Sequence, residues 1–133
     1  MYNEIRYRAL SSEVVAITFA ERCCPMREYK IIAVDFDGTL CYSNWPELGE
    51  PNLELIEYLK SCKAAGIRLI LWTCRAGEAL EKAVSWCLDH QLEFDAVNDN
   101  LPEIIELYGN NSRKITCDYY IDDKALLPEA VGT

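Results

Sequence analysis

One ten-residue segment, Ile31-Ile-Ala-Val-Asp35-Phe-Asp37-Gly-Thr-Leu40, constrains the fold more than any other part of the chain. It begins with four apolar residues, three of them β-branched, which predict a strand buried on both faces at the centre of a parallel sheet. Asp35 and Asp37 follow this strand and, being two residues apart, point to the same side of an extended backbone. Gly38 permits a sharp turn there, so both carboxylates are expected beyond the strand's carboxyl end, where open α/β sheets bind ligands.

Two carboxylates this close repel each other unless a cation or a proton lies between them, so the pair favours a divalent metal. Turn formation alone would also explain a bare Asp-x-Asp after a strand, because Asp and Gly are common turn residues. The longer string of four apolar residues followed by Asp35-Phe-Asp37-Gly-Thr-Leu resembles the first motif of the haloacid dehalogenase (HAD) superfamily of phosphohydrolases. That resemblance predicts partner motifs later in the chain.

Beyond residue 51 the sequence alternates predicted helices and strands, as a parallel α/β sheet requires. Asn52 is a predicted N-cap of a helix that Gly66 ends, with Leu53, Ile56 and Leu59 on its buried face. The other predicted elements are strands at 67–73, 94–97 and 119–121, and helices at 78–90 and from Pro102 to Gly109. His90 is the only histidine and stands at a predicted helix end, where it is expected to interact with the last carbonyls rather than to catalyse.

Residues 41–51 are predicted to form a loop, because they include Asn, Gly and two Pro residues. This loop leaves the carboxylates and returns to them, so Tyr42 and Trp45 are candidates for a flap that stacks on a substrate. The simpler hypothesis, which we favour, is that Trp45 pins the loop to the body of the protein.

Polar side chains also end the later strands, in the order of the remaining HAD motifs. Thr73 ends the second predicted strand and resembles the second motif, while Asp122-Asp123 follows the last strand and resembles the fourth. Lys114 resembles the lysine of the third motif, although it stands only eight residues before Asp122. Arg113 and Lys124 therefore stay open as alternatives for the cation that neutralises the phosphoryl group.

The resemblance implies a phosphatase whose cofactor is Mg²⁺. Asp35 would attack phosphorus to form an aspartyl-phosphate, and Asp37 would act as general acid and then as general base. Thr73 and Lys114 complete the implied catalytic set. The implied metal-binding residues are Asp35, Asp37 (through its backbone carbonyl), Asp122 and Asp123, and the implied phosphate-binding residues are Gly38, Thr73, Cys74, Arg75 and Lys114.

We therefore predict an α/β fold, a three-layer Rossmann-like (HAD-like) parallel sheet with helices on both faces, over residues 29–133. Residues 1–28 are assigned to an N-terminal extension without a predicted structure, and they lack the features of an export signal. The intervals 38–72 and 74–113 are filled by predicted core elements. No cap domain is expected, and the site should be open.

Composition limits the range of partners. Twenty-two acidic and thirteen basic residues give a net charge of −9, which argues against general nucleic-acid binding. Seven cysteines without a C-x-x-C pair favour free thiols in a reducing, cytoplasmic setting, with four of them predicted to be buried: Cys62, Cys74, Cys87 and Cys117.

A small phosphate ester or nucleotide is the expected substrate, with no membrane partner, and a homo-oligomer is allowed. Two alternatives remain open. One is a phosphatase that acts on a macromolecule, and the other is a non-catalytic phosphate- or metal-binding protein with the same fold.

Overall fold

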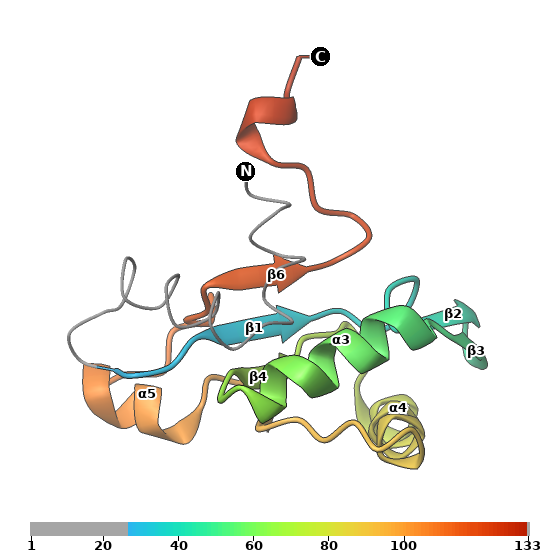
Figure 1. Ribbon diagram of the computed structural model, residues 1–133, viewed down its shortest axis with the longest axis horizontal. Coiled ribbons are helices and arrows are strands. Elements are labelled where there is room, and N and C mark those ends of the chain that lie inside the picture. The colour runs from blue at the N-terminus through green and yellow to red at the C-terminus, as the bar shows by residue number, and fades with distance from the viewer. Residues whose placement is uncertain (1–26, 133) are drawn as a thin grey trace.

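The computed structural model describes residues 27–132, and a four-stranded parallel sheet lies at its centre (Figure 1). The strand order is β5-β4-β1-β6. The strands are β1 (Ile31–Val34), β4 (Arg68–Leu71), β5 (Ala96–Val97) and β6 (Tyr119–Ile121). The predicted α/β class is confirmed. Residues 31–34 and 119–121 form strands with the predicted bounds, and the other two strands are shorter than predicted.

Three α-helices connect these strands: α3 (Leu53–Ala64), α4 (Gly77–Asp89) and α5 (Pro102–Tyr108). The predicted caps are confirmed. The side chain of Asn52 accepts a hydrogen bond from the backbone N–H of Leu55, and Gly109 ends α5 in the left-handed conformation, with φ of 72°. The ring Nδ1 of His90 lies 2.8 Å from the carbonyl oxygen of Trp86, so His90 interacts with the helix end as predicted.

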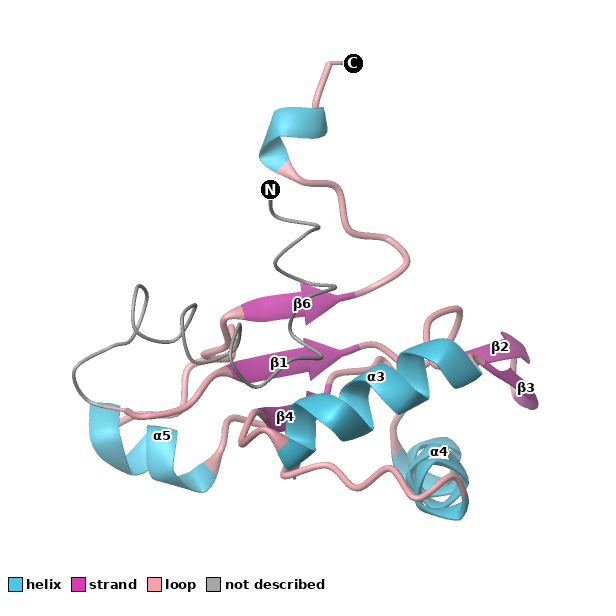
Figure 2. Cartoon of the chain, viewed as in Figure 1, coloured by secondary structure: helices cyan, strands magenta, loops and turns pink. Residues whose placement is uncertain are grey.

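The helices lie on both faces of the sheet and make three layers (Figure 2). One hydrophobic cluster joins α3 and α4 to side chains of β1 and β4, with Ile56 and Cys87 among its members. The other cluster joins Ile104 of α5 and Ile115 to the opposite face of the same strands. Leu53 was predicted to be buried, but it is 60% exposed. It is the first residue of α3, one turn before Ile56, the first buried residue of that helix.

Residues 41–51 form a β-hairpin, and the prediction of an irregular loop is wrong. Strand β2 (Cys41–Asn44) pairs antiparallel with β3 (Glu47–Pro51) around a turn at Trp45-Pro46, whose peptide bond is cis. Gly49 makes the pairing possible, because a Cβ at that position would lie 2.0 Å from the carbonyl oxygen of Tyr42. The Pro and Gly residues that suggested a loop therefore form the turn and the closest approach of a hairpin.

The expected burial of four cysteines is only partly correct. Cys62 and Cys87 are buried and Cys117 is half-buried, but Cys74 is exposed. Cys74 lies in the loop between β4 and α4, where the backbone runs over the surface instead of through the core. Cys41, for which no prediction was made, is buried.

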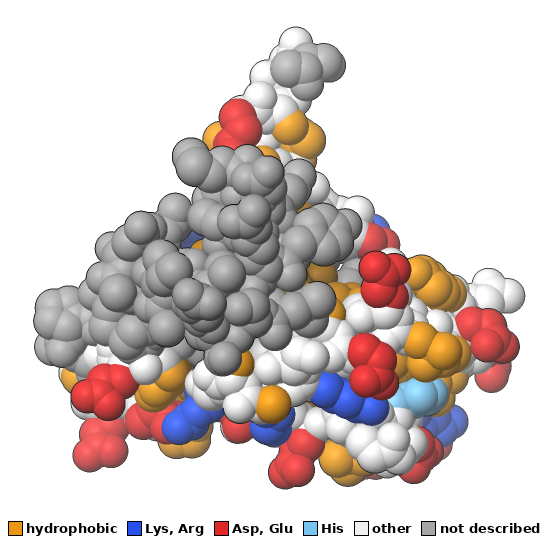
Figure 3. Space-filling model, viewed as in Figure 1, with side chains coloured by type: hydrophobic (Ala, Val, Ile, Leu, Met, Phe, Trp, Pro, Cys, Tyr) orange, Lys and Arg blue, Asp and Glu red, His pale blue; other side chains and the backbone are white. Residues whose placement is uncertain are grey.

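After β6 the chain leaves the sheet and ends in a short 3-10 helix, η1 (Pro128–Ala130) (Figure 1). Figure 3 shows the acidic side chains spread over one face of the molecule and interspersed with basic ones. None of the helices within residues 27–132 has the length and apolar character needed to cross a membrane. The prediction of an N-terminal extension concerns residues that lie, apart from the last two, outside the described part of the chain.

Candidate metal and catalytic site

Three carboxylates meet at the carboxyl ends of the two neighbouring strands β1 and β6. Asp35 follows β1, and Asp122 and Asp123 follow β6; because these strands are paired in parallel, their ends lie at the same edge of the sheet. One carboxylate oxygen from each residue lies within 4.8 Å of the other two. Carboxylate oxygens are the ligands that Mg²⁺ and Ca²⁺ take in proteins. We call these three residues the acidic triad.

The environment of Asp35 disfavours an isolated negative charge. Burial raises the pKa of Asp35 to about 6, and the charges of Asp122 and Asp123 act in the same direction. The hydroxyl of Thr39 donates a 2.8 Å hydrogen bond to Asp35 Oδ2, which lowers the pKa but only partly offsets these effects. A bound cation would relieve the repulsion within the acidic triad.

The turn after β1 is packed directly against the triad. Thr39 is buried, and its hydroxyl oxygen also accepts a 3.1 Å hydrogen bond from the backbone N–H of Asp123. Gly38 has a φ of +81°, and a Cβ there would lie 2.3 Å from Asp123 Oδ2. Gly38 was predicted to bind phosphate, and its close neighbour in the structure is a carboxylate. Thr39 was not predicted as a site residue, although it stands inside the Asp-Gly-Thr string that identified Asp37.

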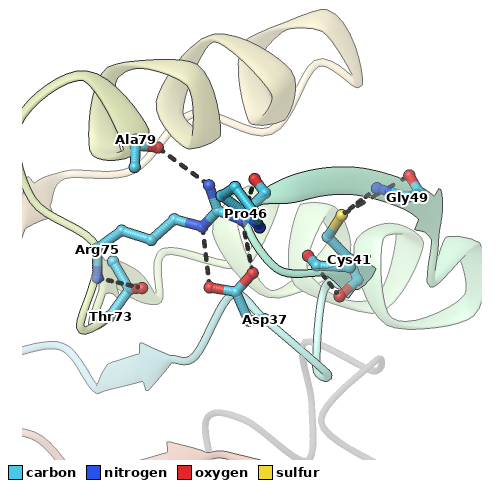
Figure 4. A network of polar contacts seen from close by, with 8 residues as sticks. Asp37, Cys41, Pro46, Gly49, Thr73, Arg75 and Ala79 are labelled. Atoms are coloured by element: carbon cyan, nitrogen blue, oxygen red, sulfur yellow. Dashed lines mark hydrogen bonds and ion pairs between the residues drawn. The ribbon is translucent and has the colours of Figure 1, made fainter.

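The carboxylate of Asp37 lies outside the acidic triad, and the metal-binding role predicted for its backbone carbonyl stays a prediction. Its Oδ2 and Oδ1 accept hydrogen bonds of 2.9 and 2.7 Å from Nε and Nη2 of Arg75 (Figure 4). Partial burial raises the pKa of Asp37, but hydrogen bonds from Arg75 and Ser43 and the charges of Arg75 and Lys124 outweigh burial and lower it. Asp37 is therefore held as a carboxylate, the form of a general base.

Arg75 was predicted to bind phosphate, and the structure engages it with protein groups instead. Only 2% of its surface is exposed, and its Nη1 donates to the carbonyl of Ala79, 3.3 Å away (Figure 4). The guanidinium carbon also lies 4.7 Å from the centroid of the Trp45 ring. Trp45 thus contacts the body of the protein, as predicted, although 63% of its surface stays exposed.

The predicted second motif lies on the strand next to β1. Thr73 follows β4, which pairs with β1, and its hydroxyl accepts a 3.1 Å hydrogen bond from the backbone N–H of Arg75. Asn98, after β5, accepts a hydrogen bond from the N–H of Thr73 at 2.8 Å and donates one to the carbonyl of Arg75 at 3.2 Å. Asn98 was not predicted as a site residue. Its position just after a strand was the only sequence feature that marked it.

The two candidate lysines have different surroundings. Lys114 is exposed, lies in the segment before β6, and its charge acts on the thiol of Cys117. Among residues 27–132, no ion pair joins Lys114 to a member of the acidic triad. The charge of Lys124 acts on Asp37, and its backbone N–H donates a 2.8 Å hydrogen bond to Asp122.

Comparison with known proteins identifies a solved structure that is similar to about three quarters of this chain. No family model and no curated protein matches the chain. A solved structure, described as that of a conserved protein from Bacteroides thetaiotaomicron, is 43% identical to this chain. The match covers 74% of this chain and 78% of that chain, with a TM-score of 0.66. The chain belongs to the family of that protein.

The description of the Bacteroides thetaiotaomicron protein names no ligand and no reaction. The edge of the sheet offers three oxygen ligands for a hard cation, a threonine hydroxyl after the adjacent strand, and a carboxylate held by a buried arginine. The three carboxylates suit the binding of a hard cation.

Proposed function

We propose that this protein is a Mg²⁺-dependent phosphohydrolase of the HAD type, without a cap domain, that acts through an aspartyl-phosphate on Asp35. One observation carries the proposal: Asp35 lies within 4.8 Å of Asp122 and Asp123, at the carboxyl ends of adjacent parallel strands. The order of the four HAD-like motifs along the chain supports the same function.

The acidic triad fits Mg²⁺ by the chemistry of its donors. Asp35, Asp122 and Asp123 would hold the ion, because all three offer hard oxygen ligands. The pKa of Asp35 is raised to about 6 by burial first and by the charges of Asp122 and Asp123 second, and a cation would favour the ionised carboxylate against both. When bound, Mg²⁺ would neutralise charge on the carboxylates and on the phosphate, which otherwise repel each other.

The protein's own groups would carry the bond changes in two steps. In the first, an oxygen of Asp35 forms a bond to phosphorus while the bond from phosphorus to the ester oxygen breaks. In the second, Asp37 takes a proton from water, the water oxygen attacks phosphorus, and phosphate leaves Asp35 as a free carboxylate. The carboxylate form of Asp37, held by Arg75, is the form that the second step needs.

The first step needs a proton on the departing oxygen unless that oxygen is stable as an anion. Asp37 would supply this proton when it carries one, and an aryl leaving group would need it least. We therefore choose an aryl phosphate as the probe. A small phosphate ester or a nucleotide remains the proposed natural substrate, because the strongly acidic chain disfavours polyanions.

One observation favours a second function. The bond between Asp37 and Arg75 withholds a proton donor from the site, which suits a protein that binds a metal and phosphate without turnover. The two functions share the acidic triad and differ only in whether Asp35 reacts.

The test is Mg²⁺-dependent hydrolysis of phenyl phosphate by the wild type, with and without chelator, and by Asp35→Asn. Asp89→Asn is the matched control, because Asp89 is an exposed carboxylate at the far end of α4. Loss of activity on chelation and in Asp35→Asn, but not in Asp89→Asn, would support the phosphatase. Wild-type protein that binds Mg²⁺ without turnover would favour the binding function, and absence of Mg²⁺ binding would contradict both.

A further inference from the structure

Arg75 lies in the loop after β4, the strand paired with β1, and its side chain is buried among protein groups. Each of its three guanidinium nitrogens donates to a protein group. Nε and Nη2 donate to the carboxylate of Asp37, Nη1 to the carbonyl of Ala79, and Nη2 also to the carbonyl of Pro46 at 3.4 Å (Figure 4). Four of the five guanidinium N–H groups are thus bonded to protein oxygens, and with 2% of its surface exposed Arg75 is poorly placed to bind a phosphate.

Aromatic rings hold the same guanidinium. The guanidinium carbon lies 5.1 Å from the centroid of the Phe36 ring. Phe36 stands between Asp35 and Asp37 in the sequence, and its side chain is completely buried. The centroid of the Trp45 ring, at the turn of the β2–β3 hairpin, lies 4.7 Å from the same guanidinium carbon. Arginine suits this position because its flat guanidinium stacks on rings while its edge donates two parallel hydrogen bonds to one carboxylate.

These contacts connect three parts of the chain that are far apart in sequence. Asp37 follows β1, Ala79 lies in the first turn of α4, and Trp45-Pro46 forms the hairpin turn. A carboxylate on a turn has rotational freedom of its own, and two parallel hydrogen bonds from a buried arginine remove most of it. The direction of the Asp37 carboxylate thus depends on Arg75, and the position of Arg75 depends on the hairpin.

We infer that Arg75 is a positioning residue that orients the Asp37 carboxylate for catalysis and couples it to the β2–β3 hairpin turn. The inference rests on the proposed function, in which Asp37 transfers the proton. Arg75 acts only through Asp37, so its loss should reduce kcat and leave substrate binding nearly unchanged. If Arg75 instead bound the phosphate of the substrate directly, its loss would mainly raise KM.

The first experiment measures kcat and KM for phenyl phosphate in the wild type, Arg75→Lys and Arg75→Ala. General acid–base catalysis and correct orientation are each worth large factors, so we expect Arg75→Ala to lower kcat about 10- to 100-fold, with KM changed less than about threefold. The kcat of Arg75→Lys should lie between the values of the wild type and Arg75→Ala, because the lysine ammonium keeps the positive charge but cannot donate the two parallel hydrogen bonds. Added guanidinium at low concentration should restore part of the kcat of Arg75→Ala, and urea, which is neutral and of similar shape, should not.

Arg68→Ala is the matched control. Arg68 also pairs with a carboxylate, Glu103 at 3.2 Å, and stacks on a ring, Tyr29 at 4.5 Å. It begins β4, at the opposite end of the strand from Thr73, so its loss should leave kcat unchanged. A similar loss of kcat in both variants would mean that the effect is a general structural one, and would overturn the inference.

Trp45 supplies a variant that does not depend on the folding of Arg75→Ala. Since 63% of the Trp45 surface is exposed, Trp45→Ala should fold, and the inference predicts a severalfold lower kcat that Trp45→Phe largely restores. If the wild type is active while Trp45→Ala and Arg75→Lys keep full kcat, the inference is wrong. If the wild type has no Mg²⁺-dependent activity, the proposed function fails first, and the inference falls with it.

Discussion

The hydroxyl of Thr39 donates a hydrogen bond to the carboxylate of Asp35 across 2.8 Å. The two residues are four positions apart, and the turn that begins at Phe36 brings them together. The same hydroxyl accepts from the backbone of Asp123, so one buried group connects the ends of β1 and β6. Asp35 and Asp123 were both predicted as site residues from the sequence, and the threonine that connects them was not.

Replacing Thr39 tests this connection. Thr39→Val keeps the shape of the side chain and removes both hydrogen bonds, so the pKa of Asp35 should rise further. We expect a loss of about 1–2 kcal/mol in the free energy of unfolding at neutral pH, measured by urea denaturation. Thr39→Ser, which keeps the hydroxyl, is the control. Equal stability of the two variants would contradict a role for the hydroxyl.

The raised pKa of Asp35 predicts how stability depends on pH. Its value is about 6 in the folded protein and 3.8 ordinarily, so the folded state holds this proton more tightly. That contribution to stability is fully present below the unfolded value and is lost as the pH rises through the folded one. We expect the metal-free protein to lose stability between these two values, and Asp35→Asn to lack this slope. The pKa of Asp37 is lowered, so its contribution to stability is present above its ordinary pKa and is lost as the pH falls through the folded value.

Magnesium should compete with the same proton. Because Mg²⁺ binds the ionised triad, the rise in melting temperature that it causes should be large above the Asp35 pKa of about 6 and should vanish below it. Thermal unfolding with and without Mg²⁺, on both sides of that pKa, measures this effect. A Mg²⁺-induced rise that is the same at both pH values would contradict binding at Asp35.

Gly38 and Gly66 form a matched pair for testing how tightly the turn packs on the triad. Both have positive φ, +81° and +93°, so alanine at either should cost about 1–2 kcal/mol of backbone strain. A Cβ at Gly38 would also lie 2.3 Å from Asp123 Oδ2, whereas a Cβ at Gly66 would meet nothing within 4 Å. We therefore expect Gly38→Ala alone to weaken Mg²⁺ binding, about tenfold by calorimetric titration. Equal affinities in the two variants would contradict the idea that Mg²⁺ binding depends on the position that Gly38 allows the Asp123 carboxylate.

Lys124 and Lys114 can be separated by the same kinetic assay. The charge of Lys124 acts on Asp37, whereas that of Lys114 acts on Cys117. If the phosphatase proposal holds, Lys124→Ala should lower kcat/KM for phenyl phosphate about tenfold, the effect of about 1.4 kcal/mol of lost charge stabilisation. Lys114→Ala should change it less. The reverse order would restore Lys114 to the role that its resemblance to the third HAD motif implies.

Arg27 connects the beginning of the described chain to the sheet. Its guanidinium donates to both oxygens of Asp118, at 2.8 and 3.1 Å, and Asp118 also accepts from the N–H of Ile31. Arg27→Ala should destabilise the protein by about 1–3 kcal/mol in urea denaturation, because the remaining carboxylate is partly buried. Lys60→Ala, which breaks the exposed pair with Glu57, should change stability by about 0.5 kcal/mol or less. Equal effects would contradict the inferred role of Arg27.

Much of the fold follows from local patterns. The apolar run before Asp35, the N-cap Asn52 and the stop at Gly109 each depend on a few neighbouring residues, and each formed as predicted. The hairpin at 41–51 did not, because its Pro and Gly residues fit a loop as well as a turn. Pairing between β2 and β3 decides between the two, and such pairing cannot be seen in a short window of sequence.

Local patterns in the sequence specify which strand ends carry carboxylates, because strand periodicity and the Asp35-Phe-Asp37-Gly string each involve a few neighbouring residues. The partner of each carboxylate, in contrast, depends on contacts between distant segments of the folded chain. The pairing of β1 with β6 brings Asp122 and Asp123 close to Asp35, whereas Asp37 forms an ion pair with Arg75, which follows β4. The cause is electrostatic: a buried guanidinium needs a carboxylate, and the nearest one in space is 38 residues away in sequence. Contacts between residues so far apart in sequence arise from the packing of the whole domain.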